Sequence, residues 1–230
     1  MSVALELDPA MSSPLPGGGR VTFTTRAAGN LSTAAGEGCA DGLARRRALS
    51  RELGLRALCA SRQVHGTHIH TAVPGEGEGA APLELDADGH ASTMVGVGVA
   101  VLAADCVPVA LGCEGAVAMI HAGWRGLADG VLEEGVRVVR SLGAGPIGAV
   151  VGPCAGACCY EVGPEVMAAL GEAPERGHLD LRRVAHARLA AAGVDGIADV
   201  TACTICDERF FSFRREQAAA GRQGGVAWLS

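Results

Sequence analysis

Short apolar runs alternate with segments whose hydrophobic residues recur at helical spacing, so the chain is predicted to contain both strands and helices. Several runs are Val-rich and only four to eight residues long, which is typical of buried strands. Strands are expected over residues 21–26, 55–64, 67–73, 96–103, 107–111, 116–121, 147–151 and 197–200. Helices are expected over residues 42–53, 124–142, 164–170 and 179–192. This mixed order predicts an α/β mixed fold of layered mixed β-sheets flanked by helices.

The chain is large enough for a substantial core, since 49% of its 230 residues are hydrophobic. Only 3% are aromatic, so Ala, Val, Leu and Gly must build that core. Residues 1–19 are rich in Pro, Gly and Ser and lack periodicity, which predicts a mobile N-terminal arm. Residues 20–230 are expected to form a single catalytic domain.

The net charge of −6 argues against a general nucleic-acid or anionic-membrane binder. The longest apolar run, residues 94–104, is too short to span a bilayer. The first residues lack a Lys or Arg followed by an apolar run, so no signal peptide is expected. The nine cysteines are an odd number, and without a signal peptide they indicate reduced thiols in a cytoplasmic protein. We expect the protein to be a monomer.

The most informative segment is a predicted hairpin whose turn spans residues 112–115. If the hairpin is symmetric about that turn, Cys106 lies directly across from His121. Directly opposed residues have Cβ atoms about 4.5–5.5 Å apart on one face of the sheet. A thiolate and an imidazole that close can share a metal ion. The alternative is a buried Cys and a hydrogen-bonded His in an ordinary hairpin.

A third ligand would complete a site with two imidazoles, one thiolate and an open position, the arrangement typical of catalytic zinc. His65, next to Gly66, is one candidate, and His68 and His70 are the others. The residues alone leave the choice among these three histidines open. A metal in such a site can activate water for attack on an electrophilic carbon.

Residues around the hairpin suggest further roles. Asp105 is interpreted as a general base, as an orienting group or as a strand-end cap. Arg125 falls in the first turn of a predicted helix, where free N–H groups attract anions such as phosphate, or is a surface Arg. Trp124 is either a core anchor or a wall on which a base stacks.

Five other cysteines lie in two short segments near the C-terminal half. Cys154, Cys158 and Cys159 are interpreted mainly as turn-packing residues, because no neighbouring His is evident. Cys203 and Cys206 form a lone CxxC pair, which is weak evidence for zinc or redox chemistry. Three of the phenylalanines lie close together, at positions Phe210, Phe211 and Phe213. They are expected to pack in the core; the alternative is that they form a lid over a flat ligand.

The motifs together resemble the multicopper polyphenol oxidase or laccase-domain family, over about residues 20–222. The matching segments are TTR at 24–26, QVHG at 63–66, ADCVPV at 104–109, HAGWRG at 121–126, GPCAGACCYEVG at 152–163, FFSFRR at 210–215 and GR at 221–222. The family pattern usually has a Gly-Gly-Val-Ser-Thr type of loop after TTR, and residues 29–33 here read GNLST. The residues before QVHG, ASR at 60–62, also depart from it.

The resemblance implies a zinc ion bound by His65, Cys106 and His121, which selects His65 over the other two histidines. It also implies purine nucleoside chemistry: phosphorolysis of adenosine, inosine, guanosine and methylthioadenosine, and deamination of adenosine. Purine nucleosides and phosphate would be the partners. Phosphorolysis is expected to pass through an oxocarbenium-like transition state, by analogy with glycoside cleavage.

On this interpretation, the catalytic residues are Asp105, Cys106 and Arg125. The substrate-binding residues are Arg26, Gln63, Trp124 and Arg125, with the two arginines as candidates for the phosphate.

Three alternatives remain. A copper-dependent polyphenol oxidase could use Met94 or Met119 as an axial ligand, but a multicopper enzyme needs more imidazoles than the 7 His of this chain. A cysteine hydrolase would use Cys106 as nucleophile and His121 as base. A binding protein that has kept the fold is the non-enzymatic alternative.

Overall fold

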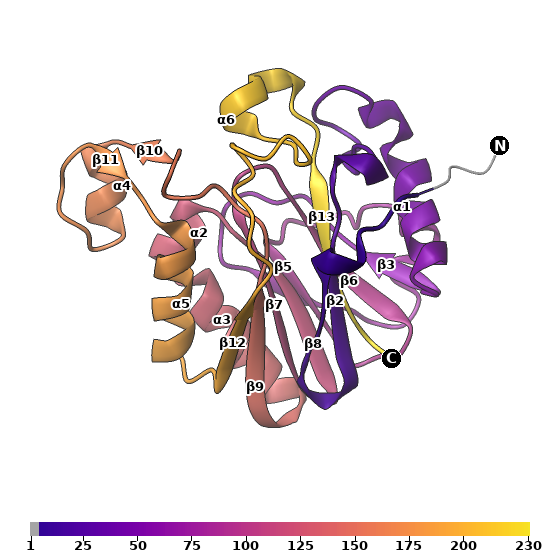
Figure 1. The fold of residues 1–230 in the computed structure, drawn as a ribbon. Helices are drawn as coiled ribbons and strands as arrows, with labels where there is room; N and C mark the ends of the chain where they lie inside the picture. Colours follow the sequence, from indigo (N-terminus) through magenta and orange to yellow (C-terminus); the bar gives the residue numbers. More distant parts are fainter. Residues whose placement is uncertain (1–4) are drawn as a thin grey trace.

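Two β-sheets stacked on each other form the centre of the structure, a computed structural model that describes residues 5–230 (Figure 1). The first sheet has the order β1-β2-β13-β6-β3, and the second has the order β12-β9-β7-β8-β5-β4. The strands of the first sheet are β1 (Ser12–Pro14), β2 (Gly19–Phe23), β13 (Gln223–Leu229), β6 (Val97–Ala103) and β3 (Ala57–Cys59). Those of the second are β12 (Gly196–Asp199), β9 (Ala144–Val151), β7 (Val107–Glu114), β8 (Ala116–Ala122), β5 (Gly89–Ser92) and β4 (Ile69–Thr71).

Helices cover both outer faces of the stacked sheets, with α1 on one side and α2, α3 and α5 on the other (Figure 1). The α-helices are α1 (Gly42–Glu52), α2 (Trp124–Asp129), α3 (Val131–Leu142), α4 (Pro164–Ala169), α5 (Leu181–Ala191) and α6 (Phe213–Glu216). Short 3-10 turns are η1 (Pro9–Met11), η2 (Pro16–Gly18), η3 (Arg26–Ala28), η4 (Cys39–Asp41), η5 (Glu78–Ala80) and η6 (Gln217–Ala219). A further pair of strands, β10 (Glu161–Val162) and β11 (Gly177–His178), lies beside α4. The predicted fold class, layered mixed sheets flanked by helices, is confirmed.

Strand alternation explains why the core has separate layers. Along β8, Val117 and Met119 pack into the cluster between the two sheets, whereas Ala118 and Ile120 pack into the cluster beneath α3 and α5. Successive side chains of a strand point to opposite faces, so a strand buried on both faces must be apolar throughout. A third cluster joins α1 to the outer face of the first sheet and includes Leu49.

The predicted hairpin is present, but its register differs from the symmetric one. Pro108, not Cys106, pairs with His121, because Cys113 pairs with Ala116 across a two-residue turn. The shift is by two positions, which leaves every side chain on its predicted face. Cys106 itself lies just before the first residue of β7.

Several other boundaries differ from the expected ones. The helix expected over residues 124–142 divides into α2 and α3 at Gly130, whose φ of 92° breaks helical geometry. The expected strands over 55–64 and 67–73 shrink to β3 and β4, which belong to different sheets.

The structure also contains strands that were not expected. Strands β5 and β13 did not stand out from the sequence pattern, and both are fully buried in their sheets. Strand β1 lies within the segment expected to be an arm and pairs with β2. Residues 1–4 of that segment lie outside the described residues. Within residues 5–230, no helix has the length and apolar character needed to cross a membrane.

Candidate metal centre and cavity

His65, Cys106 and His121 converge where β6 and β8 end. One potential ligand atom from each lies within 4.8 Å of the other two. The Cys106 Sγ is 3.9 Å from the His65 Nε2, and the two imidazole rings are 4.9 Å apart, nearly perpendicular at 74°. His70, a competing candidate, instead bonds Glu76 at 2.7 Å. The structure therefore brings together the three residues that the resemblance implied.

The buried carboxylate of Asp88 holds His65 in place. It accepts hydrogen bonds from the backbone N–H groups of Val64, His65 and Gly66, at 3.1, 2.9 and 2.7 Å. His65 adopts a positive φ of 61°, which is uncommon for a residue with a side chain. Three converging N–H donors at one carboxylate stabilise that unusual backbone. Asp88 therefore fixes the backbone from which the His65 side chain projects.

Asp88 also orients the second imidazole. Its Oδ1 lies 2.9 Å from the Nδ1 of His121, so the Nε2 of that ring is left free to face Cys106. Burial opposes a charge on Asp88, which is 0% exposed, but the hydrogen bonds from His121, Gly66 and Val64 outweigh it, and the pKa stays below its usual value. A carboxylate behind a ligating His is a recurring feature of metal sites, because it fixes the tautomer and strengthens the ligand.

Charge pairing makes Cys106 a good metal ligand. Burial alone would raise the pKa of its thiol, but the neighbouring imidazoles of His121 and His65 lower it to about 6. Burial likewise opposes a charge on His121, yet Cys106 and Asp88 raise the pKa of that imidazole to about 9. Thiolate is the form of Cys that binds metals.

The donor set fits a metal ion with three protein ligands. Two imidazole nitrogens and one thiolate suit zinc or copper. Gly123 marks the space that the three side chains share, since a Cβ there would lie 2.7 Å from the His65 Cδ2 and 3.1 Å from the Cys106 Sγ. Any larger residue at position 123 would collide with two of the ligands.

Asp105, which precedes Cys106, is fully engaged by neighbouring donors. Its carboxylate accepts from the Thr204 hydroxyl at 2.7 Å, the Ser212 hydroxyl at 3.1 Å and the Arg214 backbone N–H at 2.7 Å. Its φ of 91° turns the chain sharply just before Cys106. These contacts favour the orienting role predicted for Asp105 over the role of a general base, because each carboxylate oxygen already has a partner.

All three ligands line a cavity of about 560 Å³. Its apolar walls include Leu83, Leu102, Tyr160 and Phe213, and its positive charges come from Arg46, Arg62, Arg214 and Arg222. Of the three phenylalanines considered for a lid, Phe210 and Phe211 are buried, and Phe213 is exposed and borders the cavity.

Arg46 is the most unusual of the cavity arginines, because it is only 4% exposed. Its Nε donates to the carbonyl oxygen of Leu31 at 2.7 Å, while its Nη1 is buried without a partner in the described part of the chain. Buried guanidinium donors normally have acceptors, so an unpaired one beside a cavity indicates an anionic or carbonyl ligand.

Gln63 lines the cavity, but its amide is used by the protein. It donates to the Leu102 carbonyl at 2.7 Å and accepts from the Leu102 N–H at 2.8 Å. This pair of bonds ties the segment that carries His65 to the end of β6. Gln63 is therefore positioned to shape the cavity wall.

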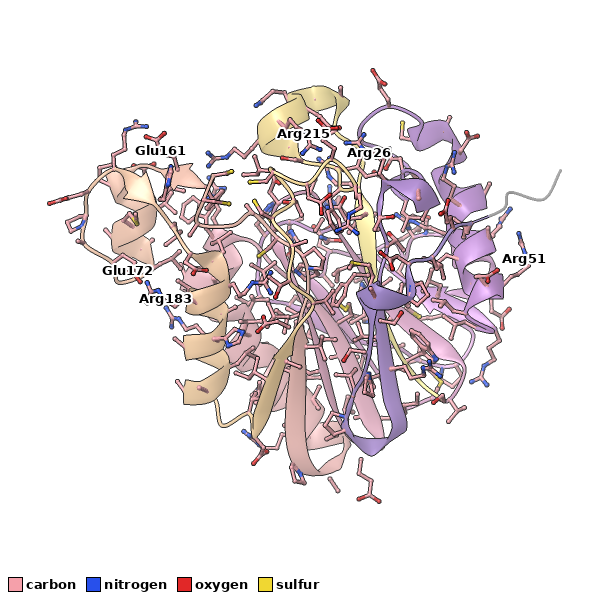
Figure 2. The ribbon with its side chains drawn as sticks, in the orientation of Figure 1. Arg26, Arg51, Glu161, Glu172, Arg183 and Arg215 are labelled. Atoms are coloured by element: carbon pink, nitrogen blue, oxygen red, sulfur yellow. The ribbon has the colours of Figure 1, made fainter. Side chains whose placement is uncertain are left out.

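The other predicted binding residues lie elsewhere. Among the described residues that line the cavity, none is Arg26, Trp124 or Arg125. The Arg125 guanidinium stacks on the Trp124 ring, 4.3 Å from its centroid. Arg26 lies under α6, near Arg215, and bonds Glu216 at 2.5 Å (Figure 2).

Sequence reasoning missed Asp88 and Arg46. Asp88 precedes an unrecognised strand, and its three N–H partners are more than 20 positions away, so no local pattern reveals it. Arg46 had a local signal: it shares a helical face with Gly42 and Leu49, both buried. The next residue, Arg47, is exposed. Arg222 was visible only as part of the GR motif.

Comparisons with known proteins agree with this geometry. The sequence profile of the family described as "Multi-copper polyphenol oxidoreductase laccase" matches residues 18–230. A Neisseria meningitidis protein of known structure, assigned to family DUF152, superposes with a TM-score of 0.81 at 30% identity, over 98% of both chains. YlmD from Geobacillus stearothermophilus superposes with a TM-score of 0.82 at 27% identity, over 96% of this chain and 94% of that one.

Two curated relatives carry the name purine nucleoside phosphorylase. The Xylella fastidiosa protein is 39% identical over 155 residues, which cover 59% of this chain and 58% of that protein. The Escherichia coli protein YfiH is 40% identical over 147 residues, which cover 56% of this chain and 58% of that protein. The matched region thus spans less than two thirds of either relative. The family match covers nearly the whole chain, and the resemblance read from its motifs is confirmed: the chain belongs to the multi-copper polyphenol oxidoreductase laccase family.

Proposed function

We propose that the chain is a zinc-dependent purine nucleoside phosphorylase that acts on adenosine, inosine, guanosine and methylthioadenosine. The observation that carries the proposal is a cavity lined both by three potential metal ligands and by a buried arginine with an unpaired donor. The names of the relatives at about 40% identity support a nucleoside substrate.

Phosphorolysis needs a bound phosphate near the anomeric carbon of the ribose. An oxygen of the phosphate forms a bond to C1′ as the bond from C1′ to the purine nitrogen breaks, and the electron pair leaves with the base. The phosphate proton ends on the purine, so the products are the free base and ribose 1-phosphate, or methylthioribose 1-phosphate from methylthioadenosine. Arg46 and Arg222 are the groups we assign to the phosphate, in place of Arg26 and Arg125, because both line the cavity.

The remaining cavity residues fit a flat base. Tyr160 and Phe213 provide aromatic surface, and the Arg214 guanidinium packs 4.6 Å from the centroid of the Tyr160 ring. Aromatic and guanidinium planes are the surfaces on which purines stack. Zinc held by His65, Cys106 and His121 would supply a Lewis acid next to the bound nucleoside.

Adenosine deamination is the second activity we propose for the same cavity, since a zinc site of this kind can also activate water for attack on C6 of adenine. A multicopper oxidase needs several histidine-rich copper sites. In residues 5–230, only one cluster of potential ligands contains histidine. That count favours zinc phosphorylase chemistry over copper oxidase chemistry.

The direct test is to incubate the purified protein with adenosine, with and without phosphate, and to separate the products. Phosphate-dependent adenine and ribose 1-phosphate are expected. Inosine that forms without phosphate would report the deaminase activity. Inosine, guanosine and methylthioadenosine are incubated in the same way. The absence of product from all four nucleosides would overturn the proposal, as would stoichiometric copper in protein expressed without added copper.

Arg46→Gln tests the phosphate assignment. Loss of a guanidinium–phosphate contact worth about 1.5–3 kcal/mol should raise the KM for phosphate by about tenfold or more. Arg51→Gln is the matched control on the same helix, because Arg51 is exposed and points away from the molecule (Figure 2). An unchanged KM for phosphate in folded Arg46→Gln protein would remove Arg46 from the site.

A further inference from the structure

Four cysteines from two loops meet at the surface, beside the cavity but outside it. Cys158 and Cys159 follow β9, Cys203 and Cys206 follow β12, and their four sulfur atoms lie within 4.8 Å of one another. The Cys206 Sγ is 2.9 Å from that of Cys159 and 3.4 Å from that of Cys158. All four thiols are free. Such convergence of four thiols needs an explanation that turn packing does not give.

The spacing matches a tetrahedral metal site better than a disulfide. A disulfide places its sulfur atoms about 2.05 Å apart. Four thiolates on one zinc ion, with Zn–S bonds of about 2.3 Å, lie about 3.8 Å from each other by tetrahedral geometry. The observed separations, from 2.9 Å to at most 4.8 Å, surround that value. Small side-chain rotations would therefore bring all four sulfurs onto one ion.

Backbone hydrogen bonds hold the two cysteine-bearing loops side by side. Cys154 and Cys203 form an isolated parallel bridge, with the Cys154 N–H on the Ala202 carbonyl at 3.3 Å and the Thr204 N–H on the Cys154 carbonyl at 3.0 Å. The Gly156 N–H donates to the Cys203 Sγ at 3.2 Å. A backbone donor aimed at sulfur stabilises the thiolate form that zinc requires.

We propose that Cys158, Cys159, Cys203 and Cys206 bind a structural zinc ion. Four protein ligands leave no open position, which is the arrangement of structural rather than catalytic zinc. The ion would clamp two loops that adjoin the cavity. Tyr160 follows Cys159 and lines the cavity, and Thr204 follows Cys203 and bonds Asp105, which lines it. This inference does not depend on the proposed activity.

The test is the number of zinc ions per chain, measured by native mass spectrometry and elemental analysis on reduced protein purified without chelator. The wild-type chain is expected to bind two. Cys203→Ser/Cys206→Ser should bind one, and His65→Ala/Cys106→Ala should also bind one. Cys39→Ser is the matched control, because Cys39 belongs to neither cluster, and it should still bind two.

Cobalt identifies which ligands hold the remaining ion. In His65→Ala/Cys106→Ala protein, Co²⁺ should give strong sulfur-to-metal charge-transfer absorption together with the d–d bands of a tetrahedral site. Bound Zn²⁺ should also protect the four cysteines from alkylation, as peptide mapping of the wild-type chain would show. The alkylation measurement uses the wild-type chain, so its result does not depend on whether a variant folds.

Three results would overturn the proposal. The first is a wild-type chain with a single zinc that Cys203→Ser/Cys206→Ser retains. The second is full alkylation of the four cysteines in zinc-loaded protein. The third is a mass lower by two hydrogens that maps to a disulfide within the cluster. Failure of nucleoside turnover would change none of these measurements.

Discussion

The two clusters of potential metal ligands lie in one molecule but are built in opposite ways. Cys106 and His121 lie at strand ends, whereas His65 lies in the loop before β4. The buried carboxylate of Asp88 bonds the His65 backbone and the His121 ring, and all three residues border a cavity. The four-cysteine cluster lies on two surface loops, and its members are exposed or half-buried. With a metal bound, the first would keep a position open for a substrate, whereas the second would complete its coordination with protein atoms.

The residues that hold each cluster in place differ, and this difference explains why we expect a catalytic metal in the first cluster and a structural metal in the second. Asp88 bonds the His121 imidazole and the backbone that carries His65, so both ligands are positioned before any metal binds. Preorganised groups are what a reaction centre needs. The four-cysteine cluster depends on backbone bonds between its loops, so an ion there would contribute mainly to the stability of those loops.

Cys106→Ala should have the largest effect. It removes a ligand from a three-ligand site, and the expected outcome is loss of the cavity metal and of nucleoside turnover, with the fold retained. Removing a residue that only hydrogen-bonds a metal ligand lowers metal affinity or activity by about 10–100-fold, so removing a ligand itself should lower them further. Zinc content and product formation measure both effects. Full phosphorolytic activity in this variant would refute the mechanism.

Asp88→Asn should have the next largest effect, because it keeps the shape of the side chain but removes the charge behind His121 and one acceptor near His65. The affinity for zinc at the cavity site should fall by about 10–100-fold, as measured by competition with a chromophoric chelator. The four-cysteine cluster should keep its ion. Asp86→Asn is the control, because Asp86 is exposed and pairs with Arg62. Equal losses in both variants would argue against a specific role for Asp88.

The sequence predicted most of the layered fold because buried strands and amphipathic helices carry local patterns. It also paired Cys106 with His121 despite a register shifted by two, since such a shift preserves which face each residue occupies. Local patterns did not predict the helix break at Gly130, because that break depends on the positive φ of a single residue.

The candidate site was predictable only in part, because its supports are far apart in sequence. Asp88 acts through backbone groups more than 20 residues away, and Arg46 through the Leu31 carbonyl. Arg125 was expected to bind an anion because it lies in the first turn of a helix soon after His121, yet its guanidinium packs on Trp124. Short spacing in sequence does not determine which way a long side chain points, because several neighbours compete for it.

Thr204→Val should have the smallest effect, and it tests whether the two clusters act separately. Its buried hydroxyl donates to Asp105, beside Cys106, while Cys203 precedes it in the second cluster. A hydrogen bond to a charged group is worth about 1.5–3 kcal/mol, so its loss should lower the unfolding midpoint by about 3–12 °C in a chain of this size. Asp105 keeps its bonds from Ser212 and Arg214, so both ions and most of the turnover should remain.

The control for this variant is Thr201→Val, which alters an exposed residue in the same loop and should leave the unfolding midpoint unchanged. Thermal unfolding, zinc content and turnover are measured on the same preparations. A Thr204→Val protein that lost the cavity metal would mean that the loop of the second cluster supports the first. Because Thr204 is the direct side-chain link from that loop to Asp105, retention of both ions would establish that each cluster holds its ion through its own supports.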